Sequence, residues 1–106
     1  MVRGYSDHQA AALGFDRAAY KFPTVPGKGT CTLVMKIWGT KCLICYFVMD
    51  DGEKLKLSVF REHVFDRFFY PEKCSLDMSE VEIGSIMEIS YGITKNGRAK
   101  FLTAKV

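Results

Sequence analysis

Residues 42–60 read CLICYFVMDDGEKLKLSVF, and this stretch decides the class of fold that we predict. Its first eight residues are almost wholly apolar, as in a strand close to the centre of a barrel. The tripeptide DDG at 50–52 is a strong hairpin signal because Asp-Gly tolerates the positive φ angles of tight turns. Apolar and polar side chains then alternate from 53 to 60, which is typical of a half-buried strand. The stretch therefore predicts two antiparallel strands joined by a tight turn.

Three more strands are predicted outside this hairpin, at 30–38, 85–93 and 98–106. The first of them is rich in β-branched and aromatic residues, which favour strands. Side chains alternate between the two faces of a strand. We therefore expect one face of this strand to carry Leu33, Met35 and Ile37. Lys36 and Trp38 would then share the opposite face.

Two segments carry helical signals. Residues 61–70 repeat apolar side chains at helical spacing and stop before a proline, which predicts an amphipathic helix after the third strand. Residues 6–20 are rich in alanine and begin with two residues that can cap a helix, Ser6 or Asp7, which predicts a second helix. The prolines that follow make residues 1–28 an extension and linker ahead of a domain at 29–106. Three strands, a helix and a two-stranded hairpin form the order of the oligonucleotide/oligosaccharide-binding (OB) fold, a mainly β, five-stranded Greek-key barrel.

The composition narrows the class of protein. A chain of 106 residues fits one domain, and 48% hydrophobic with 25% charged residues is typical of a globular protein. The N-terminus lacks the continuous apolar core of a secretory signal, and no stretch is apolar enough to span a bilayer. We therefore expect a cytoplasmic protein without a membrane partner.

Four cysteines raise the question of a metal or redox site. Cys42 and Cys45 have the C-x-x-C spacing of such sites, but they lie within a predicted strand and would point to opposite faces. Buried structural thiols are the favoured interpretation. The chain also lacks a recognisable nucleophile–base arrangement and a phosphate-binding loop, so we predict no cofactor, no metal and no enzymatic activity.

The resemblance to a known family lies in two segments, KLSVFR at 56–61 and GSIMEISYGITKNGRAKFLTAKV at 84–106. They resemble nucleic-acid-binding OB domains, in particular the small OB module of bacterial replicative DNA polymerase catalytic subunits and related single-stranded-DNA-binding domains. A Val-Phe pair ends the third strand, a glycine precedes the fourth, and a glycine turn leads into a basic fifth strand. The resemblance implies an OB barrel that binds nucleic acid. Arg61 stands where that family usually has proline.

The predicted binding site follows from the barrel. Ligands of OB folds lie across strands two and three, between the loop that joins strands one and two and the loop that joins strands four and five. Both loops are basic here, although the net charge is only +3, and the first begins with the single tryptophan. Cations for phosphates and an aromatic ring for a base suit single-stranded nucleic acid. The candidate binding residues are Lys36, Trp38, Lys41, Tyr46, Lys54, Lys56, Lys95, Arg98 and Lys100.

The register of the hairpin at 50–52 decides which aromatic side chain faces this site. A two-residue turn places Phe47 opposite Lys56 on the outer face, whereas a three-residue turn places Tyr46 there. Tyr46 is favoured because its hydroxyl tolerates a wet groove. Each candidate also has a structural interpretation, since Trp38 could simply cover the barrel rim.

Three functions are open, of which carbohydrate or other small-ligand binding rests on fold analogy alone. The other two remain in competition. The first is a sequence-tolerant binder of single-stranded DNA or RNA, with DNA preferred. The second is a protein-interaction module, in which the barrel docks in a larger assembly through a protein partner or forms a homodimer. The sequence favours the first.

Overall fold

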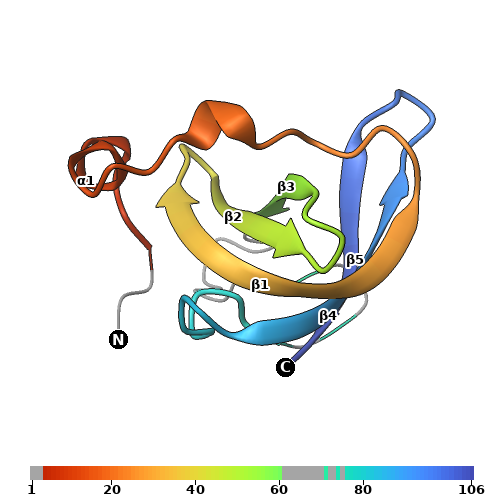
Figure 1. The fold of residues 1–106 in the computed structure, drawn as a ribbon. Helices are drawn as coiled ribbons and strands as arrows, with labels where there is room; N and C mark the ends of the chain where they lie inside the picture. Colours follow the sequence, from red (N-terminus) through yellow and green to blue (C-terminus); the bar gives the residue numbers. More distant parts are fainter. Residues whose placement is uncertain (1–3, 61–70, 72–73, 75) are drawn as a thin grey trace.

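Five antiparallel strands form one sheet in a computed structural model that describes residues 4–60, 71, 74 and 76–106. The strands follow the sheet order β3-β2-β1-β4-β5 (Figure 1). Their bounds are β1 (Gly27–Trp38), β2 (Cys42–Met49), β3 (Lys54–Phe60), β4 (Ile86–Ile93) and β5 (Ala99–Lys105). All five predicted strands are confirmed to within three residues. β1 differs most from its predicted bounds: it begins at Gly27 instead of residue 30, inside the predicted linker that ends at residue 28.

β1 is the long curved strand on which the rest of the sheet is built (Figure 1). Its first half pairs with β4 from Gly27 to Thr32, and its second half pairs with β2 as far as Trp38. The pairing with β2 shifts register between Leu33 and Met35, which marks a β-bulge. A bulge adds one residue to a strand and so reverses the faces of all that follow.

The bulge overturns the expected faces of β1. Leu33 packs in the inner core, but Met35 and Ile37 pack in a second cluster on the other side of the sheet. Lys36 is consequently turned inward, where it is fully buried. The prediction that Leu33, Met35 and Ile37 share a face was therefore wrong, because strict alternation does not survive an inserted residue.

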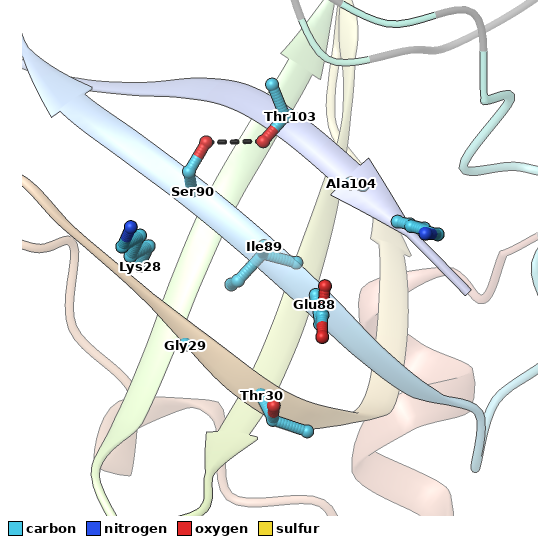
Figure 2. Close-up of a pocket in the computed structure, with 9 residues that line it drawn as sticks. Lys28, Gly29, Thr30, Glu88, Ile89, Ser90, Thr103 and Ala104 are labelled. Atoms are coloured by element: carbon cyan, nitrogen blue, oxygen red, sulfur yellow. Dashed lines mark hydrogen bonds between the residues drawn. The ribbon is translucent and has the colours of Figure 1, made fainter.

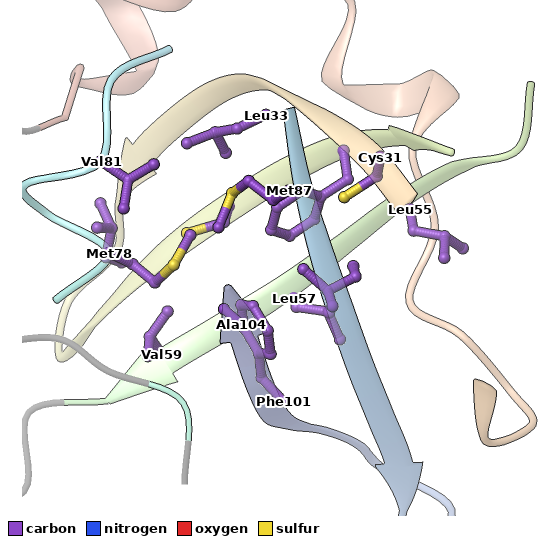
Figure 3. Close-up of a cluster of buried hydrophobic side chains, with 14 of the residues drawn as sticks. Cys31, Leu33, Leu55, Leu57, Val59, Met78, Val81, Met87, Phe101 and Ala104 are labelled. Carbon is purple, nitrogen blue, oxygen red and sulfur yellow. The ribbon is translucent and has the colours of Figure 1, made fainter. Parts of the chain in front are cut away.

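The inner core fills the concave side of the sheet with side chains from all five strands and from the loop before β4 (Figure 3). It is rich in sulfur, with Cys31, Cys45 and three methionines fully or nearly buried. Every residue of this inner cluster lies at or after Cys31. The inner core is thus built without the N-terminal segment.

The N-terminal segment folds back over the outer face of β1, β2 and β3. It contains α1 (Asp7–Ala12) and the 3₁₀ turn η1 (Arg17–Ala19). Ser6 closes a capping box at the start of α1, as predicted, but the helix ends at Leu13 because Gly14 adopts φ +80°. The predicted helix over 6–20 is therefore two short turns. We call residues 5–22 the strap.

The strap crosses the upper side of the molecule in Figure 1 before the chain enters β1. Its two ends form parallel bridges to the sheet, Tyr5 to Ile37 and Lys21 to Leu55. The predicted helix at 61–70 lies outside the described residues. In the part of the chain that the structure describes, no helix is long and apolar enough to cross a membrane.

Candidate nucleic-acid interface

The register of the β2–β3 hairpin is the first test of the predicted site. Tyr46 pairs with Lys56 and Phe47 pairs with Leu55. This is the three-residue-turn register, and it confirms Tyr46 as the aromatic residue on the outer face. Phe47 points into the inner core, where its ring meets that of Phe101 edge to face at 5.7 Å.

Tyr46 is nevertheless covered. Only 2% of its surface is exposed, because two aromatic rings of the strap pack against it. The ring centroids of Phe15 and Tyr20 lie 5.1 and 5.4 Å from that of Tyr46, both in edge-to-face geometry. Burial raises the pKa of the Tyr46 hydroxyl. In this conformation Tyr46 offers no surface on which a base could stack.

Lys36 does not belong to any surface site. Its ammonium donates hydrogen bonds to three backbone carbonyls of the loop before β4, those of Met78 at 3.3 Å, Ser79 at 3.1 Å and Val81 at 2.5 Å. Burial lowers the pKa of this ammonium, and the neighbouring Cys45 thiol partly opposes that shift. The assignment of Lys36 to phosphate binding is corrected: the bulge in β1 turned it into a clamp for this loop.

The loop between β1 and β2 holds two further candidates. Trp38 is 38% exposed at the end of β1. The backbone of Gly4 lies against its indole so closely that a Cβ there would stand 2.7 Å from Nε1. Trp38 thus retains an open edge, while the start of the described chain covers part of the ring. Lys41 is exposed in the turn that follows.

The β4–β5 turn presents the second group of cations. The backbone N–H of Thr94 donates to the carbonyl of Arg98 at 2.9 Å, and Gly97 supplies the positive φ of +79° that the turn requires. Arg98 and Lys95 are exposed at this tip, and Lys100 is exposed just beyond it.

The two basic loops do not converge. In Figure 1 the β1–β2 loop and the β4–β5 turn lie on opposite sides of the molecule, and the strap runs between them. The expected groove between two neighbouring tips is therefore not present in this conformation. Lys41 and the cations of the β4–β5 tip are separate features of the surface.

Lys54 and Lys56 form a different cluster, together with the end of the strap. The Lys54 Nζ lies 5.7 Å from the ring centroid of Tyr20, and the Lys56 Nζ lies 4.8 Å from that of Phe22. Phe22 is 45% exposed, although it is a large apolar side chain. Lys21, also exposed, completes what we call the strap–β3 cluster: Lys21, Phe22, Lys54 and Lys56.

Backbone hydrogen bonds fix the geometry of this cluster. The N–H of Lys21 donates to the carbonyl of Lys54 at 3.3 Å, and the N–H of Lys56 donates to the carbonyl of Lys21 at 3.0 Å. The Lys56 ammonium is thereby held over the exposed Phe22 ring, with Lys21 and Lys54 in the paired backbone beside it. Sequence reasoning missed Phe22 because it lies in a proline-rich linker with no periodicity. An aromatic residue directly after a lysine in such a linker was the one available signal.

A groove lies on the outer face of β1, β4 and β5, away from the strap–β3 cluster (Figure 2). Hydroxyl groups line its middle, where Ser90 and Thr103 hydrogen-bond to each other. Lys28 and Lys105 also line it, but so does Glu88, the cross-strand neighbour of Lys105. A carboxylate in that position repels phosphate. This groove is therefore a poorer nucleic-acid surface than the strap–β3 cluster.

Comparison of the chain with protein-family models, with curated proteins and with solved structures gives no match. The functional argument therefore rests on the geometry of this chain. Among the described residues, no three histidine, cysteine or acidic side chains gather as metal ligands, and all four cysteines are free thiols.

Proposed function

We propose that the protein binds single-stranded nucleic acid with little sequence preference, and that single-stranded DNA is its ligand. One observation carries the proposal: the exposed ring of Phe22 lies beneath the Lys56 ammonium, and backbone hydrogen bonds join its neighbour Lys21 to Lys54 and Lys56 of β3. Bases of a single strand offer their faces for stacking, whereas those of a duplex do not. Each stacked base contributes about 1–3 kcal/mol whatever its identity. Binding through such stacking would have little sequence preference.

The lysines supply the second half of the interaction. Lys54 and Lys56 project from alternate positions of β3, on the same side of the strand. Their ammonium groups would contact successive phosphates while a base stacks on Phe22. Binding would then release counterions, so affinity would fall steeply as salt increases.

The β4–β5 tip would extend this surface. The chain leaves Phe22 and enters β1 at Gly27, which pairs with Tyr91 of β4. A single strand that follows this path from the strap–β3 cluster approaches the tip that carries Lys95, Arg98 and Lys100. The β1–β2 loop, which carries Lys41, lies on the opposite side of the molecule, so Lys41 would make no contact.

We also propose that the domain at 29–106 is an OB-type Greek-key barrel, with residues 61–70 as the helix between β3 and β4. Two observations support this. The sheet order β3-β2-β1-β4-β5 is that of an OB barrel opened between its third and fifth strands, and these two strands contact each other. A cytoplasmic location and a binding rather than catalytic role complete the proposal, and the free thiols suit a reducing compartment.

The test is a titration of labelled oligo(dT) against four proteins. Replacing Phe22 by alanine should weaken binding by about 1–3 kcal/mol, the contribution of one stacked base. The double variant K54E/K56E should weaken binding further and flatten the salt dependence, by about 0.7 in the logarithmic slope for each phosphate that is no longer neutralised. Lys41→Glu is the control, because it reverses the charge of an exposed lysine outside the cluster.

Two results would count against the proposal. One is no binding by the wild-type protein at low salt. The other is an equal loss of affinity in Lys41→Glu and K54E/K56E, which would show only a general attraction to positive charge.

A protein-interaction module is the second candidate. The strap shows that the outer face of β1–β3 accepts polypeptide. Two apolar side chains, Leu13 in the strap and Val25 just after it, are 62% and 66% exposed. Such side chains suit docking to a protein partner or to a second copy. A stoichiometric complex that forms without nucleic acid, and that K54E/K56E does not weaken, would favour this function.

A further inference from the structure

Backbone hydrogen bonds attach the strap to the sheet at its two ends. Tyr5 exchanges two with β1 on either side of Ile37, at 2.8 and 2.9 Å. Lys21 exchanges two with β3 on either side of Leu55, at 3.3 and 3.0 Å. Between these ends the strap is held by side-chain packing in the second cluster, outside the inner core.

The middle of the strap makes the contacts that a bound ligand would make. It places the rings of Phe15 and Tyr20 against Tyr46, and it places the Tyr20 ring beneath the Lys54 ammonium. A bound single strand would make the same two kinds of contact, with a base against Tyr46 and a phosphate at the lysine. The strap and a ligand cannot occupy this face together.

The strap can leave without loss of the inner core. No described residue before Cys31 belongs to the inner cluster. The buried strap residues Ala10 and Tyr20 belong to the second cluster instead. The ion pair between Asp7 and Arg17 joins two parts of the strap to each other and is exposed to solvent. Opening the strap therefore opens the second cluster while the inner cluster stays packed, and such a local opening costs less free energy than global unfolding.

We infer that the strap is an internal competitor, which covers a second stacking site on Tyr46 and is displaced when a single strand binds there. This inference rests on the proposed function. The strap–β3 cluster would capture the strand first, because it is open in the covered state. Displacement of Phe15 and Tyr20 would then expose Tyr46 and free Lys54.

The competition has a measurable consequence. When only a fraction of molecules has the face uncovered, the apparent affinity is reduced by that fraction. Any substitution that loosens the strap without touching the sheet should therefore tighten binding.

The first experiment follows the backbone amides of Tyr5 and Lys21 by hydrogen exchange, with and without saturating oligo(dT). The Tyr5 amide donates to β1 only while the first part of the strap is seated, whereas the Lys21 amide belongs to the strap–β3 cluster. We expect the Tyr5 amide to exchange at least about tenfold faster in the complex, because displacement removes its acceptor, and the Lys21 amide to stay protected. Unchanged or slower exchange of the Tyr5 amide in the complex would overturn the inference and show that the strap is part of a fixed surface.

The second experiment compares Tyr20→Ala with Leu13→Ala in the same titration. Tyr20 packs on Tyr46, whereas Leu13 is an exposed strap residue of similar apolar character. Tyr20→Ala should bind about tenfold more tightly than the wild type, since the uncovered fraction rises, and Leu13→Ala should match the wild type. Equal or weaker binding by a folded Tyr20→Ala would overturn the inference.

The two failures are distinguishable. If neither the wild type nor Tyr20→Ala binds oligo(dT), the proposed function fails and the inference fails with it. If the wild type binds while the Tyr5 amide stays protected, only the inference fails. Exchange in the wild type decides the matter even if Tyr20→Ala does not fold.

Discussion

Replacing Lys36 by methionine tests the most unusual contact in the protein. The substitution keeps the length and apolar stem of the side chain and removes only the ammonium. That group is fully buried and donates to three carbonyls of the loop that carries Met78, Ser79 and Val81. These three residues are themselves buried, so water does not readily replace the missing donor.

Two opposing effects set the magnitude. Leaving a buried acceptor without a donor costs about 1–3 kcal/mol. The 3.3 Å hydrogen bond to the Met78 carbonyl is the longest and weakest of the three. We therefore assign the full cost of a lost hydrogen bond to only one or two of the three carbonyls. Against this, methionine recovers the penalty of burying an ammonium, the same burial that lowers the pKa of Lys36. We expect a net destabilisation of about 2–4 kcal/mol, because the stranded carbonyls remain in place.

Urea denaturation measures this directly, with Lys41→Met as the control at an exposed lysine in the next turn. The control should unfold with the wild type, within about 0.5 kcal/mol. A Lys36→Met protein as stable as the wild type, or more stable, would refute the reasoning. It would show that desolvation of the ammonium outweighs the hydrogen bonds it donates.

Two other stability predictions follow from buried groups and backbone geometry. Burial raises the pKa of the Cys31 and Cys45 thiols from 9.0 to about 12, so the unfolded chain loses these protons first as pH rises. The stability that these two thiols contribute should be fully present below pH 9 and should fall above it, by about 1.4 kcal/mol per thiol at pH 10. The free energy of unfolding of the C31A/C45A variant should therefore depend less on pH between 9 and 11. Gly97→Ala should lower the free energy of unfolding by about 1–2 kcal/mol, because alanine is strained at φ +79° although no atom blocks its methyl group. An unchanged urea midpoint for Gly97→Ala would mean that the turn adopts another conformation at no cost.

The strands and their turns were predictable because each has a local signal. Alternation in β3 and the DDG turn at 50–52 predicted the hairpin but left two registers open, and the pairing of Tyr46 with Lys56 decided between them. Local periodicity is a direct consequence of the backbone geometry of a strand, so it can be read without knowing the rest of the fold.

The bulge in β1 had no such signal. It lies between Leu33 and Met35, in a run without glycine or proline, and only pairing with β2 reveals the extra residue. The predicted face of each β1 residue after the bulge was therefore inverted, which is why Lys36 was placed at the surface. One inserted residue thus changed a proposed ligand contact into a structural clamp.

The strap was equally hidden. Its contacts with the sheet join residues far apart in sequence, Phe15 with Tyr46 and Lys21 with Leu55. A linker with two prolines gives no indication of where it will lie. The covered state of Tyr46 and the exposure of Phe22 both follow from this one placement, and neither could be predicted from composition or spacing.

The central claim is that single-stranded nucleic acid binds at the strap–β3 cluster. Titration of the ¹⁵N-labelled protein with oligo(dT) at low salt, followed residue by residue, tests it most directly. The largest shifts should appear at Lys21, Phe22, Lys54 and Lys56, and they should weaken as salt is added. No shifts at low salt, or shifts confined to the groove lined by Lys28, Ser90 and Thr103, would contradict the account.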